Sequence, residues 1–174
     1  MAARELFSEL GYEGTTIRAI ARRAGVDPAL VHYFFVNKER VFEAVVHDAT
    51  QMLEGLNPVL DGGLDDLAER LLPAYLKLWE GESGDALTAV FRTTLGKDSA
   101  EPLMDSVTPE GLVAKLAAVI GGRDARLRAS LIASQLLGVA VQRYVLKLDP
   151  LSAASMDRVV RRTAPSIQAL IAKP

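Results

Sequence analysis

The chain has 174 residues, enough for one globular domain or for a small domain joined to a larger one. It is 49% hydrophobic and 24% charged, which supplies a core and excludes an intrinsically disordered chain. It has no cysteine and two histidines, so disulfide scaffolds, thiolate metal sites and cysteine nucleophiles are excluded, and we expect no metal site and no cofactor.

The formal net charge of −2 argues at first sight against nucleic acid as a partner. The charges are segregated, however: residues 49–110 have a net charge of −8 and residues 111–174 a net charge of +7. Residues 15–40 have a net charge of +3. Binding to phosphates depends on local charge, so the total does not exclude DNA.

Apolar residues recur at helical spacing from the first residue onward. The spacing predicts a helix over 1–10 that stops at Gly11, and a second over 16–24, capped by Thr15 or Thr16 and ended by Gly25. Asp27 followed by Pro28 is a strong helix start and predicts a short helix over 28–35. A fourth helix is expected over 38–53, with Asn37 as its cap.

Loop composition follows at residues 55–63, and five longer helices are expected beyond it. They cover residues 64–80, 85–95, 109–120, 123–148 and 152–172, with a kink at Pro165 in the last. The longest uncharged stretch, residues 129–142, has 14 residues and is too short to span a membrane. There is no secretory signal, so we expect a cytoplasmic protein with no membrane partner.

The predicted fold is therefore all-α, with an N-terminal module of short helices at 1–48 and a body of longer helices at 49–174. Two short helices joined at a glycine, as at 16–35, are typical of a helix-turn-helix, whose second helix enters the DNA major groove. A helix over 28–35 is about 12 Å long at 1.5 Å per residue, close to the width of that groove.

The sequences GYEGTTIRAIARRAGV at 11–26 and LVHYFFVNKERVF at 30–42 carry a specific resemblance. They are similar to the DNA-binding module of the TetR family of bacterial repressors, and the similarity runs without gaps over about residues 3–46. It implies a homodimer that binds a palindromic double-stranded DNA operator and releases it when a small-molecule effector binds. Family members normally have more of the first helix, so we expect that helix to be truncated here.

The resemblance and the helix positions together nominate DNA-binding residues. Lys38 is in the first turn of its helix, where backbone N–H groups already favour a phosphate. Tyr33 can place its hydroxyl on a phosphate, and His32 can donate to a phosphate or a base edge. The nominated residues are Thr16, Arg18, Pro28, Ala29, His32, Tyr33 and Lys38.

The body is predicted to hold the dimer interface and the effector site. The middle of the 123–148 helix is apolar on nearly every side, so one side is expected to meet a second subunit. With the last helix it forms a predicted four-helix interface containing Ala133, Leu137, Val141, Tyr144, Val160, Ile167 and Ile171. The facing sides of the three middle helices provide the candidate effector residues Tyr75, Trp79, Phe91 and Leu116.

Two other classes of function compete with this interpretation. An enzyme is disfavoured because the chain contains none of the G-x-G-x-x-G, P-loop or G-x-S-x-G sequences. The alternative is a helical small-molecule-binding or interaction protein that keeps the module but whose DNA binding is lost or weakened. The sequence favours a ligand-responsive transcriptional regulator acting as a repressor.

Overall fold

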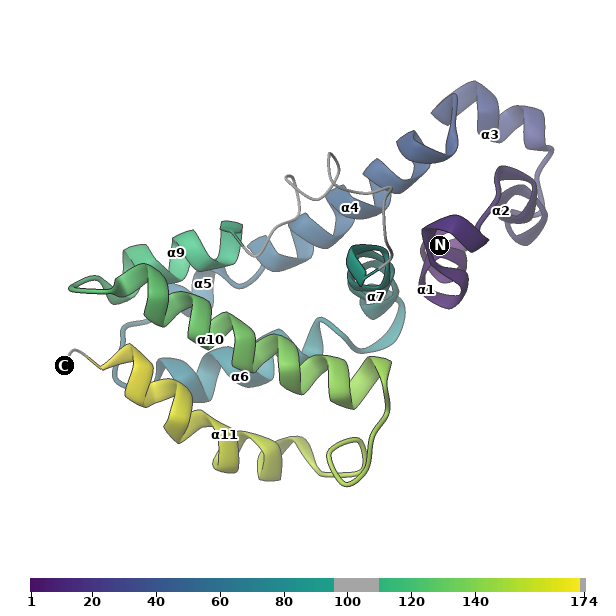
Figure 1. Ribbon diagram of the computed structural model, residues 1–174. Helices are drawn as coiled ribbons and strands as arrows, with labels where there is room; N and C mark the ends of the chain where they lie inside the picture. Colours follow the sequence, from purple (N-terminus) through teal and green to yellow (C-terminus); the bar gives the residue numbers. More distant parts are fainter. Residues whose placement is uncertain (96–109, 173–174) are drawn as a thin grey trace. The chain divides into compact units, whose positions relative to one another are not determined.

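The computed structural model describes residues 1–95 and 110–172, and in these ranges every regular element is a helix (Figure 1). The described residues fall into two compact units. The N-terminal unit consists of residues 1–52 and 81–95, and the C-terminal unit consists of residues 53–80 and 110–172. None of the described helices contains an apolar stretch long enough to cross a membrane.

The first four helices of the N-terminal unit are α1 (Ala2–Gly14), α2 (Ile17–Ala24), α3 (Pro28–Phe35) and α4 (Lys38–Glu54). The predicted stop at Gly11 is instead a kink inside α1, where the glycine has φ 71°. The predicted caps of the next helices are confirmed. Thr16 Oγ1 accepts from Ala19 N at 3.2 Å, and Asp27 Oδ1 accepts from Ala29 N at 2.7 Å. Asn37 Oδ1 accepts from Arg40 N at 2.9 Å.

An aromatic cluster forms the core where α1 meets α4. The Phe42 ring lies 5.0 Å from the Phe7 ring and 5.2 Å from the Tyr12 ring, centroid to centroid, both in edge-on geometry. Thr15 is buried beside it, and its hydroxyl lies 2.7 Å from Gly11 O and within reach of a second α1 carbonyl. That contact satisfies a carbonyl freed by the kink, so Thr15 stabilises α1 while Thr16 caps α2.

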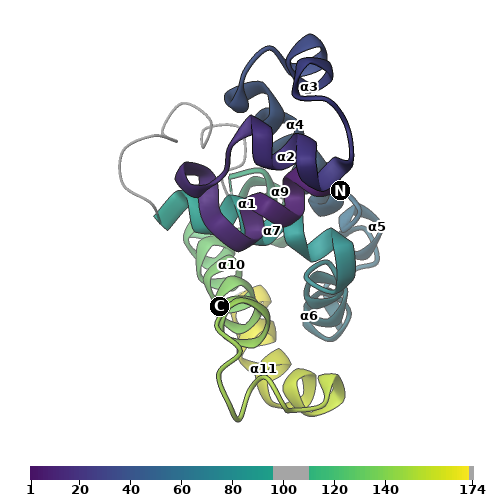
Figure 2. The same ribbon diagram turned by 90° about the vertical axis from the view of Figure 1, so that its right-hand side faces the viewer.

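The N-terminal unit is completed by α7 (Gly81–Leu95), which lies beside α1 in both views (Figures 1 and 2). Ser8 Oγ donates to Asp85 Oδ1 at 3.2 Å, and Arg92 donates to Glu9 O at 3.2 Å. The boundary predicted at residue 48 falls inside α4 and does not anticipate this return of the chain.

The C-terminal unit contains α5 (Asn57–Leu60), α6 (Leu67–Lys77), α9 (Glu110–Ile120), α10 (Ala125–Ala140), the π-helix η1 (Val141–Val145) and α11 (Met156–Ile171). Fully buried leucine and isoleucine side chains join these helices, among them Leu71, Leu116, Ile132, Leu136 and Ile167. Gln168 of α11 bridges to the start of α6, accepting from Ala68 N at 3.0 Å and donating to Leu64 O at 2.6 Å.

Three predicted helices in this unit have different bounds. The 64–80 helix is shorter, at 67–77, and the 123–148 helix ends as a π-helix at Val145. Arg143 donates to Leu151 O and Ala154 O, both at 2.7 Å, which holds the following loop against the helix end. The last helix begins at Met156 because Ser155 caps it, accepting from Arg158 N at 3.3 Å, and it continues through Pro165.

Arg128 of α10 is buried and binds the C-terminal ends of two other helices. Its guanidinium donates to Gly121 O, after the end of α9, and to Leu170 O of α11 at 2.9 Å. Longer bonds reach Ile171 O and Arg123 O, both at 3.3 Å. Because the last carbonyls of a helix carry partial negative charge, one buried cation neutralises both ends.

Candidate nucleic-acid interface

The turn at residues 25–27 orients α3 across α2 and leaves most of α3 exposed. Gly25 has φ 68°, a left-handed conformation that ends α2 and favours glycine. Ile20, Ala21 and Val31 are buried and hold the two helices together. The sequence-nominated residues of α3, namely Pro28, Ala29, His32 and Tyr33, are all exposed, as a helix that reads DNA requires.

The C-terminal end of α3 has an unusual backbone. Val36 has φ 61° and ψ −52°, and Asn37 N–H donates to Phe35 O at 2.5 Å. His32 Nδ1 lies 3.0 Å from Val36 O. One imidazole nitrogen of a nominated DNA contact is therefore already occupied within the protein.

The basic residues nominated for phosphate binding differ in their surroundings. Arg18 is exposed on α2, and Arg22, which was not among the nominated residues, is exposed one helical turn further along. Lys38 is half-buried: its Nζ donates to Tyr12 O at 2.9 Å and lies 4.1 Å from the Tyr12 ring centroid. An ammonium group has three N–H donors, so Lys38 keeps donors for a phosphate while it holds the kinked end of α1 against α4.

Arg23 is bound to α1 and does not belong to the DNA-facing set. It pairs with Glu5 at 2.8 Å and with Glu9 at 3.0 Å. The hydrogen bonds that Arg23 donates to Glu9 and Glu5 raise the pKa of Arg23, and the bond that Glu9 accepts lowers the pKa of Glu9. Arg23 therefore fixes the packing of α2 on α1.

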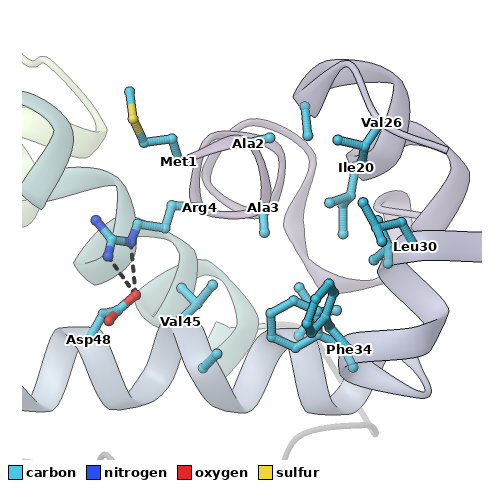
Figure 3. Close-up of a pocket in the computed structure, with 15 residues that line it drawn as sticks. Met1, Ala2, Ala3, Arg4, Ile20, Val26, Leu30, Phe34, Val45 and Asp48 are labelled. Atoms are coloured by element: carbon cyan, nitrogen blue, oxygen red, sulfur yellow. Dashed lines mark hydrogen bonds and ion pairs between the residues drawn. The ribbon is translucent and has the colours of Figure 1, made fainter. Parts of the chain in front are cut away.

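An apolar groove of about 320 Å³ opens in the N-terminal unit between the start of α1, α3 and α4. Figure 3 shows Met1 and Ala3 on one side of it, with Leu30 and Phe34 opposite. Arg4 closes one edge through an ion pair with Asp48 Oδ2 at 2.6 Å. Apart from Arg4 and Asp48, which pair with each other, the lining side chains are apolar, and we assign the groove to incomplete packing.

The nominated dimer residues are divided between the surface and the core of the C-terminal unit. Ile167 and Ile171 are 0% and 1% exposed within a single chain, so they pack in its own core and have no area to offer a partner. The other nominated residues of this set, Ala133, Leu137, Val141, Tyr144 and Val160, are half-buried.

Sequence reasoning missed the most exposed apolar side chains of α10. Leu127 and Leu131 are 62% and 45% exposed and stand one helical turn apart, and Ser134 and Gly138 continue the same face. We call these four residues the α10 stripe. The i, i+4, i+7, i+11 spacing of the stripe is visible in the sequence, and it is the signal that could have identified these residues.

The nominated effector residues lie in different units. Tyr75, Trp79 and Leu116 are buried in the C-terminal unit, whereas Phe91 is on α7 of the N-terminal unit. Trp79 Nε1 is buried and makes no hydrogen bond of ordinary geometry. Burial raises the pKa of Tyr75 to about 12, and the nearby indole of Trp79 opposes that rise. A second buried donor without a partner, Arg143 Nε, belongs to the π-helix.

The end of α6 and the π-helix are joined by a hydrogen bond. Tyr144 Oη donates to Glu80 Oε1 at 3.0 Å. Burial raises the pKa of Tyr144, and the bond to Glu80 acts in the same direction. Glu80 follows Trp79 and Tyr144 follows Arg143 in the sequence. The hydrogen bond between Glu80 and Tyr144 therefore brings the segments that contain the two unpaired donors, Trp79 Nε1 and Arg143 Nε, side by side in the C-terminal unit.

The exposed helix α3 is capped at its start and packs on α2 through a tight turn, which defines a helix-turn-helix. The chain is therefore a helix-turn-helix protein with a second, all-α unit. The family model described as "Bacterial regulatory proteins, tetR family" matches residues 1–45. The model described as "Tetracyclin repressor-like, C-terminal domain" matches residues 65–171. The chain belongs to the TetR family of bacterial regulatory proteins.

Relatives and solved structures agree with this assignment. The chain is 30% identical over 87 residues to IcaR, a negative transcriptional regulator of the biofilm operon icaADBC in Staphylococcus epidermidis, a match covering 42% of this chain and 47% of IcaR. It is 28% identical over 97 residues to the Escherichia coli regulator BetI, covering 45% and 50%. The chain spans about half the length of these curated relatives.

Among solved structures, a TetR-family regulator from Streptomyces coelicolor is 34% identical, with a TM-score of 0.64 over 98% of this chain and 90% of that one. A putative fatty acid metabolism regulator from Clostridium perfringens has a TM-score of 0.78 over 99% and 97%, at 17% identity. The second likeness shows the fold alone.

Proposed function

We propose that the chain is a transcriptional repressor that binds a palindromic operator as a homodimer and leaves it when a small molecule binds the C-terminal unit. The observation that carries the proposal is the exposed face of α3, with Pro28, Ala29, His32 and Tyr33 free of the protein's core. Arg18 of α2 and Lys38 of α4 flank that helix and supply phosphate contacts, while Thr16 caps a helix whose N-terminus faces the DNA backbone.

Dimerisation is assigned to α10 and α11. The α10 stripe offers exposed leucines next to small residues, which permit close helix approach, and Val141 follows three residues after Gly138. The half-buried Val160 of α11 is assigned to the same interface. A two-fold dimer brings two copies of α3 to the two half-sites of one palindromic operator, which compensates for the weak positive charge of one reading surface. Ile167 and Ile171 support this face from inside the chain.

The effector is assigned to the neighbourhood of Tyr75 and Trp79. Trp79 Nε1 is buried and its interaction with Tyr75 is not a well-formed hydrogen bond, which is energetically unfavourable. A ligand that brings a hydrogen-bond acceptor to Trp79 Nε1 therefore gains a better bond than the protein supplies. The surrounding side chains are apolar, including Leu116. An apolar or aromatic compound with one acceptor group fits these surroundings, and neither a cofactor nor an enzymatic activity is part of the proposal.

The DNA-binding part is tested by selecting duplexes from a random pool with the purified chain. We expect enrichment of a two-fold symmetric site and a steep loss of affinity with salt. Lys38→Ala should lower the slope of log affinity against log salt by about one per protomer. Lys77→Ala, which removes the same charge from an exposed position at the end of α6, should leave the slope unchanged. Absence of a symmetric site, with the folded dimer intact, favours the alternative of a binding protein without DNA activity.

The effector part is tested by fluorescence, because Trp79 is the single tryptophan of the chain. Compounds that release the operator should change Trp79 emission, and Tyr75→Phe should weaken both effects together. A compound that releases the operator from the wild type and leaves Trp79 emission unchanged would place the effector site elsewhere.

The dimer part is tested by sedimentation velocity. Leu131→Glu puts a charge in the α10 stripe and should yield monomers that no longer bind the operator. Leu10→Glu, at another exposed leucine on α1, is the matched control and should remain dimeric.

A further inference from the structure

The end of α3 is a rare turn centred on Val36. Its dihedral angles, φ 61° and ψ −52°, and the 2.5 Å bond from Asn37 N–H to Phe35 O are those of a classic γ-turn. A β-branched side chain seldom adopts a positive φ, so this backbone is strained. Strained backbone in folded proteins is concentrated at functional sites, so the groups that this turn positions are candidates for a functional role.

The turn positions the Val36 carbonyl against His32. Val36 N–H donates to His32 O at 2.9 Å, and His32 Nδ1 lies 3.0 Å from Val36 O. A carbonyl oxygen only accepts hydrogen bonds, so Nδ1 must carry a proton. In a neutral imidazole the other nitrogen, Nε2, then has a free lone pair and acts as an acceptor.

We propose that His32 Nε2 reads an exocyclic amino group of adenine or cytosine in the operator. The inference rests on the proposed DNA-binding function, which places the exposed face of α3 in the major groove. His32 is three residues after Ala29 and four after Pro28, so it shares a helix face with two small side chains that allow close approach to base edges.

Hydrogen-bond chemistry makes this assignment selective. Phosphate oxygens, guanine N7 and O6, and thymine O4 are acceptors, and none of them can bond to an acceptor nitrogen. The donors in the major groove are adenine N6 and cytosine N4. Neutral His32 therefore favours adenine or cytosine over guanine or thymine on the strand it faces, and it is a base-reading residue instead of a phosphate contact.

The first test measures the tautomer in the full chain labelled with nitrogen-15. Two-bond proton–nitrogen correlations of the imidazoles are recorded at about pH 8, where an ordinary histidine is neutral. We expect the Nδ1–H form for His32, with His47, exposed on α4, as the internal reference. An Nε2–H form for His32 overturns the inference.

The second test compares selected operators for the wild type, His32→Ala and the control His47→Ala at the same pH. At one symmetric position per half-site, the wild type and His47→Ala should require adenine or cytosine, and His32→Ala should not. Replacing that base by purine or 2-pyrimidinone, which lack the amino group, should weaken wild-type binding about tenfold and leave His32→Ala unchanged.

The possible failures are distinguishable. If the wild type selects no symmetric site, the proposed function fails and the inference falls with it. If the wild type selects a site whose base preferences His32→Ala preserves, the function stands and the inference is overturned. Equal weakening of His32→Ala on all sequences, with a lower salt slope, identifies a phosphate contact and also overturns it.

Discussion

Replacing Arg128 tests whether one buried guanidinium holds two helix ends. In Arg128→Met the apolar stem is retained and the bonds to Gly121 O and Leu170 O are lost. At about 1.5 kcal/mol for each bond to a charged group, the free energy of unfolding should fall by about 3 kcal/mol. The two longer bonds, to Ile171 O and Arg123 O, add little to this value.

The assay is urea unfolding followed by circular dichroism at a fixed protein concentration. Arg128→Lys keeps the charge but cannot span both helix ends, so it should lose about half as much as Arg128→Met. Arg123→Met, an exposed position in the loop before α10, is the matched control. A loss below about 0.5 kcal/mol for Arg128→Met, the range of ordinary surface substitutions, would refute the assignment.

Three further outcomes are expected. Burial raises the pKa of Tyr75 from 10.0 to about 12, so its stabilising contribution is present below pH 10, and about 3 kcal/mol of it is lost as the pH rises through 12. Tyr75→Phe should therefore reduce the difference between the free energies of unfolding measured at pH 9 and at pH 11.5, and an unchanged difference contradicts this. Thr16→Ala should lower the free energy of unfolding, measured by urea denaturation, by about 1 kcal/mol. Thr16→Ser should leave it unchanged, because a serine hydroxyl also caps α2. Ala44→Leu should fill the apolar groove and raise the free energy of unfolding by about 1 kcal/mol, whereas a decrease would mean that the groove has no room.

The helix-turn-helix was predictable from sequence because its determinants are local. Thr16, Asp27 and Asn37 act on backbone groups two or three residues away, and glycine at 25 supplies a conformation that other residues seldom adopt. Helical spacing likewise predicted the long helices that lie within residues 1–95 and 110–172, apart from bounds set by tertiary bonds such as those of Arg143.

The features that were not predicted depend on contacts between distant residues. Two isoleucines at helical spacing on the last helix satisfy an interface and a core equally well, and only packing against α6 and α10 assigns Ile167 to the core. The γ-turn gives Val36 a positive φ, which valine disfavours, so the local sequence does not predict the turn. The position of the Val36 carbonyl in this turn determines which imidazole nitrogen of His32 is free, so the sequence does not predict that either.

Because the chain returns to α1 through α7, the N-terminal unit depends on residues that lie far from the helix-turn-helix in the sequence. A fragment ending at residue 48 lacks the helix that covers α1, so it leaves an apolar surface bare that the full chain encloses. During synthesis this unit cannot close until residue 95 has left the ribosome. The chain leaves this unit after residue 52 and returns to it at residue 81, so any fragment that keeps α7 joined to the first four helices must also carry residues 53–80 of the other unit.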